Sequence, residues 1–241
     1  GEVFERPDCG ELLRELLGCC GRNCFGFPIG GRIHRDEQRV DARRLFSPAA
    51  PGCTGCGQAE RIDAQVLATA CETLARDPAC PGLSINLSTE ALGHTSMRES
   101  FIATLQAHRQ IARRLWVDVQ ESSALRHPTE FRMLCTALSA LGCKVGLKHA
   151  GQDFAHIPGL HELGLDYIKI SAAFIRDIDH TPGNQTLVHS LCTLAHSIGL
   201  TVIAEGVGNP GEASTLARLG LDGMTGPGLP AAPDRTMPGS R

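Results

Sequence analysis

The chain has 241 residues, of which 42% are hydrophobic and 20% are charged, and this balance is typical of folded globular domains rather than disordered or fibrous chains. A formal net charge of −3 argues against the basic surface that nucleic-acid binding requires. No apolar run approaches the length of a membrane span, and an acidic N-terminus broken by Pro7 and Gly10 is unlike a signal peptide. We therefore expect a cytoplasmic domain without nucleic-acid or membrane contacts.

Eleven cysteines, an odd number, are spread along the chain. Cys71, Cys135 and Cys192 fall inside apolar patterns, where a thiol packs as a small hydrophobic group. This usage favours a reducing compartment over a secreted disulfide scaffold. A single C-x-x-C pair, Cys53 and Cys56, has no second pair at zinc-site spacing, so we expect plain thiols in a loop there.

From residue 59 onward, helix-like and strand-like segments alternate. Apolar spacing or capping residues predict helices at 59–76, from 96 onward, and at 131–141, 155–163, 187–198 and 210–220. Short runs between them predict strands at 82–88, 115–120, 144–149, 167–171, 201–205 and 223–226. In the first part we expect a short helix at 11–17, strands at 24–29 and 39–46, and a loop at 47–57.

Eight strands, six of which alternate with helices, indicate βαβ units and a parallel sheet. In a chain of this length they predict an α/β fold, a TIM-like (β/α)8 barrel in a single domain. The alternative, a doubly wound sheet, would need a glycine-rich first turn, and no G-x-G-x-x-G follows a strand. We expect an N-terminal helical lead-in at 1–23, the barrel at 24–233 and a Pro-rich tail at 234–241.

Polar side chains stand at the predicted carboxyl ends of the strands, where barrels place their chemistry. They are Asp41, Asn86, Asp118, Glu121, Lys148, His149, Lys169 and Glu205. Taken singly, Asn86 could cap a turn and Glu121 could be a solvated loop residue. Lys169 lies between two isoleucines, so it faces the barrel interior, where its ammonium needs a carboxylate or a phosphate.

Several segments carry a family pattern in consistent order and spacing between residues 59 and 233. They are LSINLS (83–88), LWVDVQES (115–122), GLDYIKISAAFI (164–175), VIAEGVGNPGE (202–212) and the stretch 220–233, with fainter counterparts in GFPI (26–29) and VDARRL (40–45). Together they resemble EAL domains, the cyclic di-GMP phosphodiesterase family, with its "INLS", "EITES", "YIKID" and "VIAEGVET" segments. The resemblance implies a barrel with an irregular first strand. It also implies divalent metals that activate a water to attack a phosphodiester.

By this resemblance the metal ligands would be Asp41, Asn86, Asp118 and Glu205, and the nucleotide contacts would include Asn86, Glu121 and Lys169. Asp41 and Asp118 are shorter than the family's glutamates, and Lys148 with His149 replaces its adjacent aspartate pair. Other family positions are changed as well, at Phe27, Leu45, Gly208 and Thr225.

The exchange at Lys148 and His149 raises the site charge by about 3, or about 4 if the imidazole is protonated. At about 4 Å and an effective dielectric near 20, each opposed unit charge is worth about 4 kcal/mol, whereas Mg²⁺ prefers several anionic oxygens. We therefore expect no cofactor, a vestigial metal site and no catalytic residue. Lys148 is expected to neutralise Asp118, Glu205 or Asp41, and Asp118 or Glu205 is expected to hold His149.

The sequence thus predicts a degenerate, non-catalytic EAL-like domain of bacterial cyclic di-GMP signalling. It would act as a protein-interaction or nucleotide-receptor module with a regulatory protein as partner, and cyclic di-GMP binding and a homodimer stay open. The loop 47–57 is a candidate partner surface. The alternative is an active phosphodiesterase that converts cyclic di-GMP to pGpG with Mg²⁺ or Mn²⁺. A third reading is a metal-free lyase in which Lys169 or Lys148 forms a Schiff base.

Overall fold

The computed structural model describes residues 27–28, 38–39 and 56–229, except 79, 81, 152 and 157–159, and side chains from residue 63 onward except that of Ala155. The expected helix at 11–17, the lead-in 1–23, the tail 234–241 and Asp41 lie outside the described residues. The loop expected at 47–57 also lies mostly outside them, and its last two residues belong to a helix that begins at Cys56.

Eight strands form one sheet in the order β1-β8-β7-β6-β5-β4-β3-β2. They are β1 (Phe27–Pro28), β2 (Gln38–Arg39), β3 (Leu83–Asn86), β4 (Leu115–Gln120), β5 (Lys144–Ala150), β6 (Tyr167–Ile170), β7 (Thr201–Glu205) and β8 (Gly223–Thr225). All neighbours from β2 to β8 are parallel, and β1 runs antiparallel to β8. This topology confirms the predicted TIM-like barrel with an irregular first strand. The second strand lies at the start of the range expected for it.

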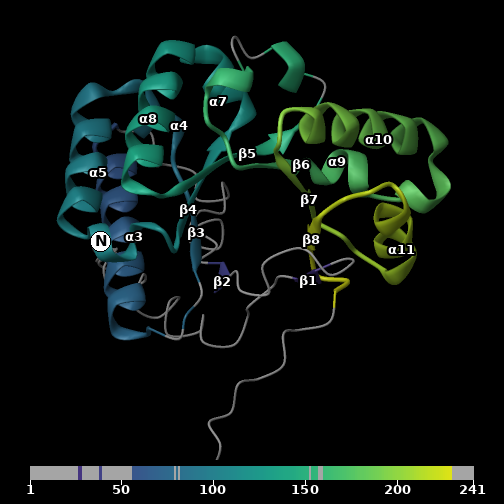
Figure 1. The fold of residues 1–241 in the computed structure, drawn as a ribbon, viewed down its shortest axis with the longest axis horizontal. Helices are drawn as coiled ribbons and strands as arrows, with labels where there is room; N and C mark the ends of the chain where they lie inside the picture. The colour runs from purple at the N-terminus through teal and green to yellow at the C-terminus, as the bar shows by residue number, and fades with distance from the viewer. Residues whose placement is uncertain are drawn as a thin grey trace, which may run out of the picture.

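The long helices flank the strands in two groups (Figure 1). Helices α3 (Cys56–Arg76), α5 (Thr95–Ala107) and α8 (Pro128–Leu141) lie on one side, and α10 (Pro182–Ser197) and α11 (Pro210–Arg218) lie on the other. As the apolar spacing predicts, α8 buries Phe131, Leu134, Cys135 and Leu138. It ends at Gly142, whose φ of 85° is the left-handed conformation that glycine adopts without strain.

Short helices that follow strand ends are missing from the sequence prediction. They are α4 (Thr89–Gly93), α7 (Glu121–Arg126) and α9 (Ala172–Ile175), with α6 (Arg109–Ala112) after α5. The single helix expected at 155–163 is wrong: two 3₁₀ turns, η2 (Phe154–His156) and η3 (Leu160–Glu162), stand there. Pro158 and Gly159, which lie between the turns in the sequence, do not favour a continuous helix. Helix α10 begins five residues before the predicted start.

A small apolar cluster lies apart from the main core and consists of Trp116, Tyr167 and Ile203. We call it the barrel floor, because Asp118, Lys169 and Glu205 follow its members by two positions on the same strands and therefore face the same interior. The rings of Trp116 and Tyr167 are 4.8 Å apart. Gly146 makes room for the Tyr167 ring, since a Cβ there would lie 2.2 Å from a ring carbon.

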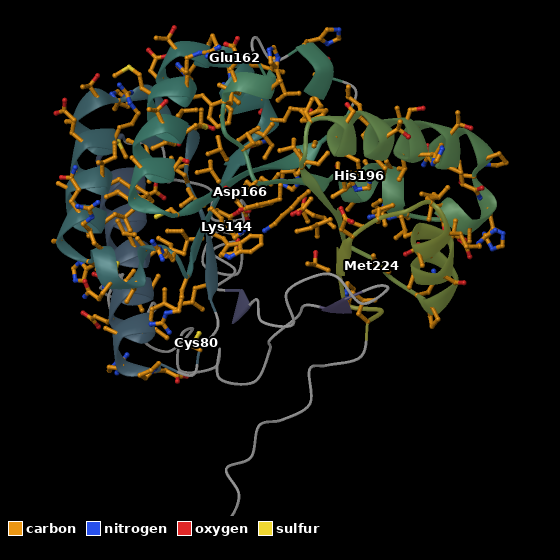
Figure 2. The ribbon with its side chains drawn as sticks, in the orientation of Figure 1. Cys80, Lys144, Glu162, Asp166, His196 and Met224 are labelled. Carbon is orange, nitrogen blue, oxygen red and sulfur yellow. The ribbon has the colours of Figure 1, made fainter. Side chains whose placement is uncertain are left out.

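An exposed ion pair borders the barrel floor. The Lys144 Nζ lies 3.7 Å from Asp166 Oδ1, with both side chains about one-third exposed, and the two residues are neighbours in Figure 2. The same ammonium lies 5.0 Å from the centre of the Trp116 ring. Asp166 also accepts the Val145 N–H at 2.9 Å, so the pair joins β5 to the start of β6.

The five cysteines whose side chains the structure describes are buried. Cys71, Cys80, Cys135, Cys143 and Cys192 are free thiols inside the protein. Burial raises the pKa of the Cys135 and Cys192 thiols to about 12, so they are protonated at neutral pH and pack as small hydrophobic groups. Among the helices of the described part, none combines the length and apolarity that crossing a membrane requires.

Candidate functional site

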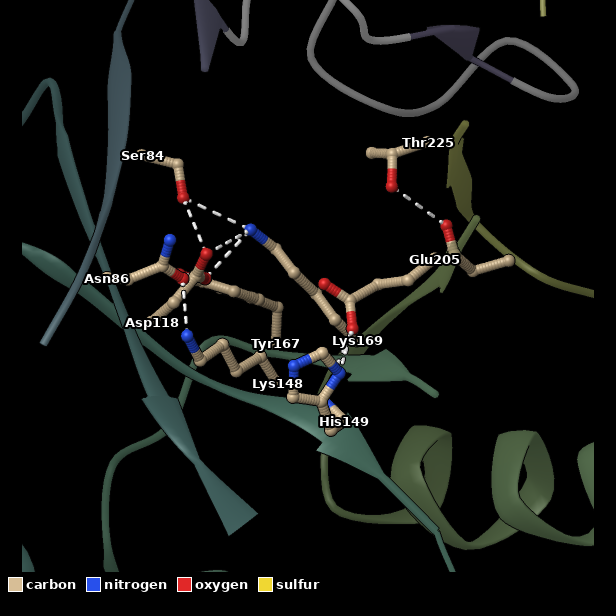
Figure 3. A network of polar contacts seen from close by, with 10 residues as sticks. Ser84, Asn86, Asp118, Lys148, His149, Tyr167, Lys169, Glu205 and Thr225 are labelled. Carbon is tan, nitrogen blue, oxygen red and sulfur yellow. Dashed lines mark hydrogen bonds and ion pairs between the residues drawn. The ribbon is translucent and has the colours of Figure 1, made fainter. Parts of the chain in front are cut away.

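The Asp118 carboxylate lies at the centre of the barrel interior with 1% exposure. Its Oδ1 accepts the Tyr167 hydroxyl at 2.7 Å, and its Oδ2 accepts the Ser84 hydroxyl at 3.0 Å. The Lys169 ammonium lies 2.7 Å from Oδ1 and 2.8 Å from Oδ2, and it also donates to Ser84 Oγ at 3.1 Å (Figure 3). Asp118 is therefore the carboxylate partner that the buried Lys169 requires.

Lys148 joins β5 to β3 across the intervening β4. Its Nζ donates to Asn86 Oδ1 at 2.9 Å, and the residue is only 8% exposed. Asn86 is aligned with Asp118 on β4, and Lys148 is aligned with Gln120 on the same strand. Of the acids expected to neutralise Lys148, Asp118 contacts Lys169, Glu205 contacts His149 and Asp41 lies outside the described residues, so the expected pairing stays a prediction.

His149 is held by Glu205, one of the two acids expected for it. Its Nδ1 lies 2.9 Å from Glu205 Oε2, and its backbone N–H donates to the same oxygen at 3.3 Å. His149 has a φ of 55°, an uncommon left-handed conformation for a residue with a Cβ. The pairing register with β6 shifts between Leu147 and Ala150. This irregularity allows the imidazole to reach across to β7.

Glu121 is a buried site residue and not a solvated one. It opens α7 with 8% exposure, and its Oε1 accepts the Gly151 N–H at 3.0 Å. Burial raises the pKa of this carboxyl, and the negative charge of Asp153 adds to the rise, whereas the Gly151 bond and His149 lower it. The contact joins α7 to the segment that follows His149.

This raised pKa predicts a pH-dependent stability difference between the wild type and Glu121→Gln. The folded pKa of Glu121 lies above its unfolded value, so its contribution to stability is complete below the unfolded pKa and is lost as pH rises through the folded pKa. Gln keeps an oxygen for Gly151 but cannot ionise. Urea unfolding from pH 4 to pH 8 should therefore show the variant gaining stability relative to wild type as pH rises. A difference that falls with pH would contradict this assignment.

Four further polar residues of the site were not predicted from the sequence: Ser84, Tyr167, Asp63 and Ser88. Ser84 and Tyr167 lie two positions before Asn86 and Lys169 on the same strands, so the alternation of strand side chains could have indicated them. Asp63, on α3, accepts both the backbone N–H and the hydroxyl of Ser88. No motif or spacing in the sequence marks Asp63.

A divalent metal such as Mg²⁺ is bound by several anionic oxygens that are free to coordinate it. Across the part of the chain with described side chains, no cluster of three or more His, Cys, Asp and Glu residues could hold a metal ion. The predicted ligands Asn86, Asp118 and Glu205 are each bonded to a lysine or a histidine. These groups, as they stand, do not fit a divalent cation.

Known families and curated proteins that are similar to this chain include the EAL domain and a cyclic di-GMP phosphodiesterase. The model of the EAL domain matches residues 19–230. The cyclic di-GMP phosphodiesterase PdeF of Escherichia coli is 29% identical over 143 residues, which are 59% of this chain and 19% of PdeF. The chain spans less than a third of the length of the curated relatives it matches.

Two solved structures show the range of similar folds. The EAL domain of FimX from Pseudomonas aeruginosa, bound to c-di-GMP, has a TM-score of 0.70 at 21% identity and covers 91% of this chain and 93% of its own. BlrP1 of Klebsiella pneumoniae, in a complex with manganese and c-di-GMP, has a TM-score of 0.60 at 26% identity and covers 69% of this chain and 43% of its own. FimX, at this identity, supports the fold alone.

Proposed function

This chain belongs to the EAL domain family, and we propose that it is a non-catalytic regulatory module of cyclic di-GMP signalling. It works by binding a nucleotide or a regulatory protein and not by hydrolysis. Similar proteins include a named cyclic di-GMP phosphodiesterase and a complex with manganese and c-di-GMP. The proposal separates this chain from such enzymes on the chemistry of its own side chains.

One observation carries the proposal: the oxygens that the family resemblance assigns to metal are each bonded to a lysine or a histidine of the chain itself. Asn86 accepts from Lys148, Asp118 from Lys169, and Glu205 is bonded to His149. A divalent ion at these oxygens would have to displace or approach two ammonium groups. At about 4 Å and an effective dielectric near 20, each such repulsion costs about 4 kcal/mol, which corresponds to roughly three decades of affinity.

Asp118 supports the same proposal through its hydrogen bonds. Its two oxygens take contacts from Tyr167, Ser84 and Lys169, and as an aspartate it is one methylene shorter than the family's glutamate. A carboxylate in this position stabilises the buried ammonium. Metal ligation would break that ion pair inside the barrel, where an unpaired lysine is costly.

The lyase alternative is not favoured. A Schiff base requires a neutral amine with access to a carbonyl substrate. Lys169 is 1% exposed and lies within 2.8 Å of both Asp118 oxygens, an ion pair that favours the charged ammonium. We propose instead that the chain acts by binding. Its proposed partner is a regulatory protein, and its proposed assembly is a homodimer.

Incubation with cyclic di-GMP and Mg²⁺ or Mn²⁺, followed by chromatography for pGpG, tests the proposal. The wild type should form no pGpG above the protein-free control, and calorimetry should detect no tight binding of either metal. The variant carrying Lys148→Asp and His149→Asp regains two carboxylates and should bind metal more tightly than wild type. Metal-dependent pGpG formation by the wild type, abolished by Asp118→Ala, would refute the proposal.

A further inference from the structure

A pocket outside the barrel lies among three helices. Helices α3, α4 and α5 pack against one another on one side of the strands (Figure 1). The space between them is about 310 Å³, including the part that is open to solvent, which is enough for one side chain. Its walls are apolar and buried, and they are formed by Leu67, Ala91, Met97 and Phe101.

Polar groups face this apolar space from two helices. Asp63 lines it from α3, and Ser100 and Thr104 line it from successive turns of α5. The Asp63 Oδ2 accepts the Ser88 backbone N–H at 3.1 Å and the Ser88 hydroxyl at 2.5 Å. A carboxylate has about four acceptor sites. Because the hydrogen bonds that described residues make to Asp63 both end on Oδ2, its Oδ1 has the capacity for a donor from outside.

The fold only partly compensates the charge of Asp63. Burial raises the pKa of its carboxyl, the Ser88 bonds lower it, and the charges of Glu90 and Lys148 respectively raise and lower it. Because the net shift is upward, the ionised carboxylate is less stable here than in water. A cation that entered the pocket would therefore meet a carboxylate that is held in place and gains from a positive partner.

We propose that this pocket is a docking site for an arginine side chain of the regulatory protein partner. The inference rests on the proposed function, because it specifies the chemistry of the partner that this function requires. A guanidinium is weakly hydrated and has five donors, enough for the Asp63 carboxylate and the hydroxyls of Ser100 and Thr104. The alkyl stem packs against Leu67 and Phe101. Arginine in such a pocket is typical of the residues that dominate binding energy.

Titration with butylguanidinium, which reproduces the arginine side chain from Cα onward, tests the pocket without the partner. NMR of protein labelled with ¹³C at the methionine methyl groups reports binding. The Met97 signal, assigned by its loss in Met97→Leu, should shift in the millimolar range, and that of the exposed Met133 should not. Butylurea, which is similar in shape but uncharged, should bind about tenfold more weakly, because it lacks a charge-assisted hydrogen bond.

Three variants separate the charge of the pocket from its space. In Asp63→Asn, butylguanidinium should bind about tenfold more weakly and lose its advantage over butylurea. Ala64→Leu adds a side chain at an exposed position that lines the pocket, and it should abolish binding of both probes. Gln65→Leu adds leucine at the next exposed position, outside the lining, and should leave both affinities unchanged. Circular dichroism checks that each variant is folded.

The inference is overturned if the Met97 signal does not respond, if Asp63→Asn binds butylguanidinium as tightly as wild type, or if butylurea binds equally well. N-acetylarginine methylamide, an arginine with a peptide bond on each side, should bind at least as tightly as butylguanidinium. Its exclusion would show that the pocket does not take a protein side chain. All these results leave the non-catalytic function standing, because that function fails separately, by metal-dependent formation of pGpG.

Discussion

Replacing Lys169 with Met is expected to lower the free energy of unfolding by about 3 to 5 kcal/mol, the range for breaking a buried ion pair from one side. The ammonium and the Asp118 carboxylate are both 1% exposed and 2.7 Å apart. Lys169→Met removes the ammonium that contacts both carboxylate oxygens, and the hydroxyls of Ser84 and Tyr167 are neutral donors, so the buried negative charge is less well compensated. Urea unfolding followed by circular dichroism at pH 7 measures the loss.

Lys144→Met is the matched control for this prediction. Its ion pair with Asp166 is 3.7 Å long and about one-third exposed on both sides, so its removal should cost no more than about 1 kcal/mol. A second comparison adds Asp118→Asn to Lys169→Met, which removes the stranded charge and should recover part of the loss. Equal small losses for Lys169→Met and Lys144→Met would show that the buried pair does not stabilise the barrel.

The second large effect is expected for Gly146→Ala, which should destabilise the protein by about 1 to 3 kcal/mol, as overpacked cores do. The added Cβ would lie 2.2, 2.3 and 2.5 Å from three atoms of the Tyr167 ring. The ring is fully buried, contacts Trp116 and donates to Asp118, so it cannot move without loss of these contacts. The midpoint of thermal unfolding measures the effect.

Gly183→Ala provides the control on α10. No heavy atom lies within 4 Å of the Cβ that it would add, and alanine favours the helix over glycine. This variant should be neutral or more stable by up to about 1 kcal/mol. A Gly146→Ala protein as stable as Gly183→Ala would contradict the close packing of Tyr167 against β5.

The barrel could be predicted because its strands and long helices are regular. The apolar spacing of α8 and its Gly142 end give the helix directly. Short helices such as α7 have fewer than two turns, so they contain too few apolar residues for a helical period to be detected in the sequence. The region 155–163 misled the prediction because its apolar residues suggest a helix while Pro158 and Gly159 oppose one.

The candidate site was partly visible in the sequence. Alternation along β6 identifies Lys169 as an inward-facing residue that needs an anion, and the structure supplies Asp118. Which strand's acid pairs with which base could not be predicted, because the pairing depends on register and on the irregular backbone at His149. Asp63 escaped notice because a polar residue on a helix usually faces solvent, and only the packing of α3 brings it to Ser88.

The barrel floor also has an optical consequence. The chain has one tryptophan and one tyrosine, and their rings lie 4.8 Å apart, with the tyrosine hydroxyl bonded to Asp118. Indole fluorescence from the intact protein therefore originates at Trp116 alone, two strand positions before Asp118 of the buried ion pair with Lys169. Its emission maximum and its quenching give a label-free signal of that interior, and energy absorbed by Tyr167 passes to Trp116 while the two rings, tilted by 40°, stay close together.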